Sequence, residues 1–161
     1  MKAFPRWKGK RSRVGCWRVA MVVSRFNSRY TDRLRMQCLK RLGELGLPAA
    51  SAEVTEVPGA FELPLAAQTL AAGGRFQAVL CLGAILRGAT SHYDLVCAET
   101  ARGIQQAGLT TGVPVIFGVI TCDTAAQALE RCSGGPLDAG RHAAEAALWM
   151  AGWMEDERGK P

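Results

Sequence analysis

Strand-like and helix-like segments alternate along almost the whole chain, and this alternation is the strongest constraint on its fold. Apolar, β-branched runs are each followed by a segment whose apolar residues recur every three or four positions. Such alternation is typical of a parallel sheet, because consecutive parallel strands need a helix-length crossover between them. Since these crossovers are right-handed, the pattern predicts an α/β fold, a three-layer α/β/α sandwich with a central parallel sheet.

The segment boundaries follow from the same pattern. Strands are expected at 17–23, 52–57, 76–86 and 114–120, and helices at 31–46, 61–72, 91–107, 124–131 and 138–155. Thr31 is expected to cap the first helix, and Ser91 and Asp94 have the spacing of a capping box at the third. These elements form a single domain at 16–155, with a basic, flexible extension at 1–15 and a C-terminal tail at 156–161.

Basic residues gather at the N-terminus. The chain has 161 residues and a net charge of +6, and the stretch 1–18 contains no acid. Its cations are Lys2, Arg6, Lys8, Lys10, Arg11, Arg13 and Arg18. A basic extension can touch nucleic acid or an anionic surface, but we expect a solvated segment and no nucleic-acid contact. No membrane contact is expected either, because no apolar run approaches the roughly 20 residues that span a bilayer.

The cysteines are spaced too widely for a metal site. No C-x-x-C motif or Cys/His cluster accompanies them, so neither zinc nor iron–sulfur binding is predicted. The six are Cys16, Cys38, Cys81, Cys97, Cys122 and Cys132. Most lie in apolar segments, which indicates reduced core thiols in a cytoplasmic protein.

Polar, glycine and aromatic residues collect where the predicted strands end. Ligands of open α/β sheets bind beyond the carboxyl ends of the strands. The strand ends here are 24–27, 57–62, 83–92 and 121–123. We therefore expect the binding site to be built from these segments.

The segment AILRGATSHYD at 84–94 joins a strand to a helix start, where unpaired N–H groups and the helix dipole favour anions. Gly88 lets the backbone approach a ligand, and Thr90 and Ser91 add hydroxyl donors. A phosphate cradle and an ordinary helix start both fit this pattern. Arg87 either adds charge to the anion site or pairs with a carboxylate in a subunit contact.

Three further side chains are candidates for chemistry or binding. His92 is the best general acid or base, although a structural or solvent-facing role is the alternative. Glu62 can accept hydrogen bonds from ligand hydroxyls or simply favour a helix start. Phe26 can stack on a ring or pack in the core.

Four motifs in a fixed order resemble the lumazine synthase family of riboflavin biosynthesis. They are RFN at 25–27, VPGAFELP at 57–64, LGAILRGATSHYD at 82–94 and GVPVIFGVIT at 112–121, followed by ALER at 128–131. The resemblance covers residues 17 to 152. It implies a flavodoxin-like topology and the condensation of 5-amino-6-(D-ribitylamino)uracil with 3,4-dihydroxy-2-butanone 4-phosphate. It implies no cofactor and no metal.

The resemblance also assigns residues to roles. The pyrimidine substrate is expected on Phe26, Ala60, Phe61, Glu62, Ala84, Ile85 and Leu86. Ala89 and Thr90 resemble the residues that bind the butanone phosphate, and His92 resembles the residue that transfers protons. Phe117 and Arg131 resemble residues contributed by a neighbouring subunit, with Arg131 on the phosphate. The family therefore implies a homo-oligomer of pentamers that stand alone, pair into decamers or form icosahedral 60-mers. Riboflavin synthase is a candidate partner.

One segment departs from the family pattern. Within CSGGPLDAGRHAAEA at 132–146, Ala139 stands where the family commonly has a lysine near the phosphate, and Arg141 is a candidate replacement. Two alternatives to the enzyme therefore remain. One is a relative that binds a flavin or heterocycle without turning it over, and the other is a shell-forming scaffold.

Overall fold

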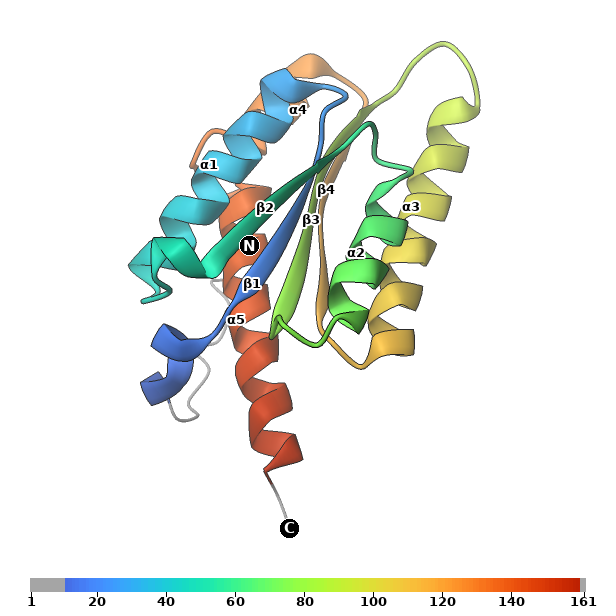
Figure 1. Cartoon of the computed structure of the whole chain (residues 1–161). Helices are drawn as coiled ribbons and strands as arrows, with labels where there is room; N and C mark the ends of the chain where they lie inside the picture. The colour runs from blue at the N-terminus through green and yellow to red at the C-terminus, as the bar shows by residue number, and fades with distance from the viewer. Residues whose placement is uncertain (1–10, 160–161) are drawn as a thin grey trace.

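A sheet of parallel strands runs through the centre of the protein (Figure 1). The structure is a computed structural model and describes residues 11–159. Within this range the sheet has four strands in the order β2-β1-β3-β4, and every neighbouring pair is parallel. The strands are β1 (Val19–Ser24), β2 (Ala52–Val57), β3 (Ala78–Leu86) and β4 (Val115–Cys122).

Helices cover both faces of the sheet. In Figure 1, α1 and α5 lie on one face with the short α4, and α2 and α3 lie on the other. The helices are α1 (Ser28–Glu44), α2 (Leu63–Ala72), α3 (His92–Thr111), α4 (Ala125–Glu130) and α5 (Ala139–Arg158), with 3-10 turns η1 (Arg11–Cys16) and η2 (Ala49–Ser51). The predicted three-layer α/β/α sandwich with a parallel sheet is confirmed, and its strand order corresponds to the flavodoxin-like order 2-1-3-4.

The core is divided by the sheet into two apolar clusters. Every residue of β1 is buried, and successive side chains point to opposite faces. Met21 and Val23 pack with α1 and α5, whereas Ala20 and Val22 pack with α2 and α3. Because β1 is covered on both sides, its sequence is continuously apolar rather than alternating.

Two predicted helix caps are wrong. Asn27 precedes α1 as its N-cap, while Thr31 lies inside the first turn and donates from its hydroxyl to the Ser24 carbonyl at 2.8 Å. Ser91 precedes α3, but its side chain accepts no capping hydrogen bond, and Asp94 pairs with Arg87 instead. The guanidinium of Arg87 engages both carboxylate oxygens of Asp94, and such a paired, doubly charged contact is stronger than a single bond from a neutral backbone N–H, which explains the second outcome.

The ends of the chain are only partly described. Of the predicted basic extension at 1–15, residues 1–10 lie outside the described residues and the rest belong to η1. At the other end, α5 continues to Arg158, beyond the predicted helix end at residue 155. Within residues 11–159, no helix is long and apolar enough to cross a membrane.

Four of the six cysteines are buried, whereas Cys97 is partly buried and Cys16 is exposed. All six are free in the structure, and burial raises the pKa of Cys38 and Cys81 to about 12, which keeps both protonated at neutral pH. No group of three or more potential ligands (His, Cys, Asp or Glu) that could hold a metal ion occurs within residues 11–159.

Close packing of α5 on α1 depends on Gly140. A Cβ there would overlap the carbonyl oxygen of Leu34, which is backbone inside a helix and cannot move aside easily. We expect Gly140→Ala to lower the free energy of unfolding by about 1–3 kcal/mol, as overpacking does in other cores. Urea unfolding followed by circular dichroism measures this change.

Gly43 is the matched control, because it also lies in a helix but has open space where a Cβ would be. Gly43→Ala should raise the free energy of unfolding by about 0.5–1 kcal/mol. Equal effects of the two substitutions would contradict the close approach at Gly140.

Candidate active site

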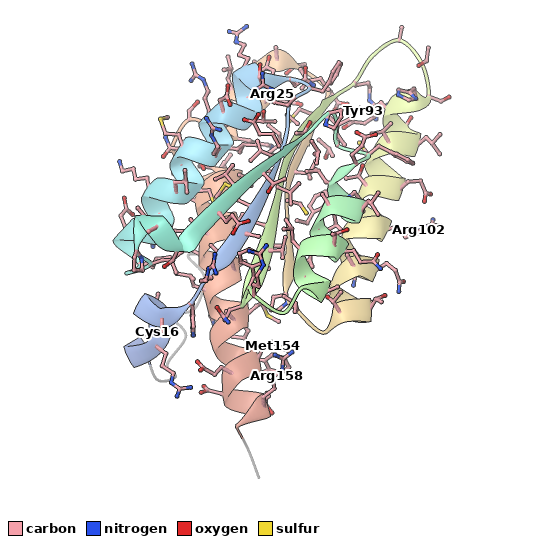
Figure 2. All side chains as sticks on the ribbon, in the orientation of Figure 1. Cys16, Arg25, Tyr93, Arg102, Met154 and Arg158 are labelled. Carbon is pink, nitrogen blue, oxygen red and sulfur yellow. The ribbon has the colours of Figure 1, made fainter. Side chains whose placement is uncertain are left out.

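A cleft of about 710 Å³ lies at the carboxyl ends of the strands. It is built from the loops that follow β1, β2 and β3. Strand order reverses between β1 and β3, so α1 and α3 leave the sheet toward opposite faces and a crevice opens between their first turns. Figure 2 shows Arg25 and Tyr93 at this end of the sheet, with Cys16 and Arg158 at the opposite end.

Most of the site residues expected from the sequence meet in this cleft. Its lining includes Phe26, Ala60, Phe61, Glu62, Ala84, Ile85, Leu86, Thr90 and His92. Gly59 and Gly88 line it as well, and for Gly88 this agrees with the expectation that it lets the backbone approach a ligand. Side chains from three separate loops are thus gathered around one cavity.

The loop after β1 is held rigidly while its aromatic ring stays free. The N–H of Arg25 donates to the Val57 carbonyl at 2.8 Å, and the N–H of Phe26 donates to the Pro58 carbonyl at 2.9 Å, which continues the pairing with β2. Asn27 has a left-handed backbone, φ +63°, and its Nδ2 donates to the Ala84 carbonyl at 2.8 Å. The Phe26 side chain is 71% exposed, so a fixed backbone presents an uncovered ring.

The loop after β2 places a carboxylate beside open backbone. Glu62 precedes α2 as its N-cap and is exposed. A Cβ on Gly59 would lie 2.9 Å from Glu62 Oε2, so the glycine leaves the space that this carboxylate occupies. Phe61 beside it is 60% exposed, which gives the cleft a second uncovered aromatic ring.

The loop after β3 carries the candidate anion site. It is exposed throughout, and a Cβ on Gly88 would meet no heavy atom within 4 Å. His92 is the first residue of α3, and its N–H donates to Thr90 Oγ1 at 3.4 Å. The first N–H groups of a helix have no acceptor within the helix, so this end of α3 favours an anion.

Arg87 is fully engaged with carboxylates of its own chain. Its Nε lies 2.7 Å from Asp123 Oδ1, and its Nη1 and Nη2 lie 3.2 Å and 3.0 Å from Asp94 Oδ2 and Oδ1, respectively. Hydrogen bonds to Asp94 and Asp123 raise the pKa of Arg87 above its ordinary value. Of the two roles that the sequence left open, the structure shows pairing with carboxylates, both of them in the same chain.

The cleft lacks a fixed positive charge. Among the described residues that line it, none is lysine or arginine, and its ionisable side chains are Glu62, His92 and Tyr93. The nearby Arg87 shares its single charge with two carboxylates, so that cluster adds no net positive charge. These lining residues therefore offer an anion the start of α3 and a threonine hydroxyl but no full positive charge.

Three predicted site residues do not line the cleft. Ala89 lies on the β3–α3 loop but outside the lining. Phe117 lies within β4, on a different groove, and Arg131 is the exposed C-cap of α4. For Phe117 and Arg131 this placement is consistent with the prediction that they contribute to the site of a neighbouring subunit. That contribution stays a prediction.

Four further residues line the cleft without having been predicted as site residues: Asn27, Tyr93, Leu95 and Val96. Leu95 and Val96 follow His92 by helical spacing, a signal that would have found them. Tyr93 is half-buried, and its hydroxyl bonds to Thr121 and Cys97; burial is the main cause that raises the pKa of both Tyr93 and Cys97.

Arg141, the candidate replacement for the family lysine, forms an ion pair away from the cleft. The guanidinium of Arg141 lies 3.6 Å from Glu44 at the far end of α1, and Ala139 is the first residue of α5. Arg141 therefore pairs with a carboxylate on α1 and does not line the cleft.

The family model and the relative that match this chain carry the same name. The family model of 6,7-dimethyl-8-ribityllumazine synthase matches residues 17–155, a range that includes every residue of the cleft. A curated 6,7-dimethyl-8-ribityllumazine synthase from Desulfosudis oleivorans is 45% identical over 136 residues. That alignment covers 84% of this chain and 87% of the relative.

The left-handed backbone of Asn27 generates a stability prediction. Asn27→Ala and Asn27→Gly both remove the hydrogen bond to Ala84, but only alanine must hold its Cβ in the left-handed region. We expect the alanine variant to be less stable than the glycine variant by about 1–2 kcal/mol. Urea unfolding of both variants measures the difference, and equal stabilities would show that the backbone relaxes.

Proposed function

This chain belongs to the 6,7-dimethyl-8-ribityllumazine synthase family, and we propose that the cleft beyond β1, β2 and β3 is the site of its reaction. The reaction joins 5-amino-6-(D-ribitylamino)uracil to 3,4-dihydroxy-2-butanone 4-phosphate, forms the lumazine and releases phosphate and water. The observation that carries the site assignment is the convergence of Phe26, Glu62 and His92, from three loops, on one cavity.

The pyrimidine end of the cleft lies between the loops after β1 and β2. An exposed phenyl ring on a fixed backbone is suited to stacking on a flat heterocycle, and Phe26 has this arrangement. Backbone groups around Ala60 can hydrogen-bond the ring edge. The Glu62 carboxylate accepts hydrogen bonds, which fits the hydroxyls of the ribityl chain. Ala84, Ile85 and Leu86 supply the remaining wall.

The phosphate end lies at the start of α3. Thr90 offers a hydroxyl, and the positive end of the helix dipole of α3 favours the anion. Because no lysine or arginine lines the described cleft, a cation must reach the phosphate from outside it. We assign this role to Arg131 of a neighbouring subunit, where a guanidinium can bind the phosphate and help it depart.

Sharing the site requires an oligomer, for which the pentamer of the family is our proposal. Phe117 lies on edge strand β4, in an apolar groove of about 570 Å³ between α3 and α5. Phe61 and Leu95 of the cleft lining are exposed apolar side chains, and so is Leu65 in the first turn of α2. Apolar surfaces of this kind mark contacts between proteins, and packing one against the other brings Phe117 toward the neighbour's cleft.

The proposed chemistry uses position more than reactive groups. The amine of the pyrimidine attacks the ketone to form an imine with loss of water, phosphate then leaves, and ring closure releases a second water. Holding both substrates together can lower the barrier by up to about 7–11 kcal/mol. His92 lies on the same cleft wall as the anion loop, where its imidazole can move protons between nitrogen and oxygen atoms.

The direct test mixes both substrates with the purified protein and follows the lumazine absorbance. Product formation supports the enzyme, and binding of the pyrimidine without turnover favours the heterocycle-binding alternative. Particle mass measured on the same sample tests the pentamer and the shell.

The free thiols are also consistent with a reducing compartment, so we propose that the protein acts in the cytoplasm.

We predict that His92→Ala lowers kcat by about 10²–10⁴-fold, the usual contribution of a positioned acid or base. The Michaelis constants should change little, because binding depends on other groups. His142→Ala is the control: it removes the other histidine, which lies on α5 outside the cleft, and should leave kcat unchanged. Complete loss of turnover in His92→Ala with both substrates bound would contradict the dominance of proximity.

Arg131→Ala should mainly raise the Michaelis constant for the phosphate substrate, since a charge-assisted bond to the phosphate is lost. Steady-state kinetics with each substrate varied in turn measures the effect. An unchanged constant for the phosphate substrate would remove Arg131 from the site.

Mixed oligomers test whether Arg131 acts in the neighbouring subunit. When His92→Ala and Arg131→Ala chains are unfolded and reassembled together, some clefts combine an intact His92 with an intact Arg131. Activity above that of either variant alone is expected. No recovery in particles shown to contain both chains would place the two residues in the same subunit's site.

A further inference from the structure

The loop that carries the phosphate end of the cleft has few hydrogen bonds of its own. Between Arg87 and His92 every residue is exposed, and the bonds that involve this stretch join Thr90 to His92 and Ser91 to the next turn of α3. A loop so weakly bonded is free to open locally unless something outside it restrains it. The geometry of Thr90 and His92 therefore needs a separate restraint.

Arg87 is in a position to supply that restraint. Its N–H donates to the Cys122 carbonyl at 2.9 Å, which anchors its backbone to the end of β4. Its guanidinium then reaches across the loop to both oxygens of Asp94 in α3 and, through Nε, to Asp123. The guanidinium carbon also lies 4.0 Å from the centre of the Tyr93 ring.

These contacts join three elements at one side chain. Asp94 belongs to the first turn of α3, Asp123 follows β4, and Arg87 follows β3. Tyr93, under the guanidinium, lies between His92 and Asp94 in the sequence. The planar guanidinium of an arginine can bond two carboxylates at its edges while one of its faces stacks on an aromatic ring. The ammonium group of a lysine has no such plane and cannot do both.

We infer that Arg87 is a positioning residue, which with Asp94 and Asp123 forms a clasp that holds the β3–α3 loop and His92 in the geometry the reaction needs. This inference rests on the proposed function of the cleft and adds to it a role for three charged residues outside the lining. None of the three lines the cleft, and the guanidinium of Arg87 is already bonded to carboxylates on two sides. Arg87 therefore acts through the loop rather than on the substrate.

The clasp makes a selective prediction. Loosening it disturbs Thr90 and His92, whereas Phe26 and Glu62 are held by other loops and keep their places. We expect Arg87→Met to raise the Michaelis constant for the phosphate substrate and to lower kcat, each on the order of tenfold, since a displacement of about 1 Å can cost up to about 100-fold. The Michaelis constant for the pyrimidine should stay within about twofold.

Asp123→Ala separates the clasp from a direct effect of Arg87. This variant should show part of the same change, and it should add little when combined with Arg87→Met, because both break one network. Full additivity of the two substitutions, or wild-type kinetics in Arg87→Met, would overturn the inference.

Arg41→Met is the matched control for lost ion pairs. Arg41 also bridges two carboxylates, Glu44 at 2.9 Å and Glu145 at 2.7 Å, but it joins α1 to α5 away from the cleft. Its loss should lower stability without raising the Michaelis constant for the phosphate substrate. A similar rise in both variants would attribute the effect to general destabilisation and overturn the clasp.

Amide hydrogen exchange of the full-length protein without substrates provides a readout that does not need activity. Peptides covering 87–95 should exchange faster in Arg87→Met than in wild type. In Arg41→Met the exchange rate of the same peptides should be unchanged. Unchanged exchange in Arg87→Met would overturn the clasp even in an active enzyme. If the wild-type protein forms no lumazine, the proposed function fails, and the exchange experiment still decides whether Arg87 holds the loop.

Discussion

The parallel pairing of β1 with β3 is the constraint on which the cleft depends. The register runs from Val19 opposite Ala78 to Val23 opposite Leu82. Both strands therefore run in the same direction, and the loops that follow them emerge at one end of the sheet. The helices after these strands pack on opposite faces, which opens the crevice between them. The bond from Asn27 to the Ala84 carbonyl then ties the two strand ends across this crevice. Phe26 and His92 face one cavity because of this arrangement.

Charge distribution connects the cleft to assembly. The described lining holds Glu62 and His92 but no lysine or arginine, and the nearest arginine on the β3–α3 loop is bonded to two carboxylates. A phosphate placed there within a single chain would meet helix N–H groups and a hydroxyl but no full positive charge. In our proposal a second subunit would bring Arg131 to this phosphate, which would explain both the lack of a lining cation and the exposed apolar surfaces. Assembly and catalysis would then depend on the same contact.

Much of the fold and of the lining was predictable from the sequence, because local signals and the global fold agree. Apolar runs and helical spacing predicted each strand and helix, and the rule that ligands bind at strand ends located the cleft. Resemblance to a known family then assigned individual residues such as Phe26, Glu62 and Thr90. What escaped prediction depends on competition between possible partners of a side chain, which is decided only in the folded chain. Asp94 had the spacing to complete a capping box with Ser91, yet the guanidinium of Arg87 binds it.

The sequence by itself determined the order of strands and helices, the apolar faces that must be buried and the segments at which a ligand can bind. These are properties of residues close together along the chain, where periodicity and backbone preference act directly. Only the tertiary structure decided that Asn27 adopts a left-handed backbone, that Arg87 bonds Asp123 as well as Asp94, and that Arg141 turns to Glu44. Partners of charged side chains are chosen by distance in space, and residues far apart in the sequence become neighbours only when the sheet has formed.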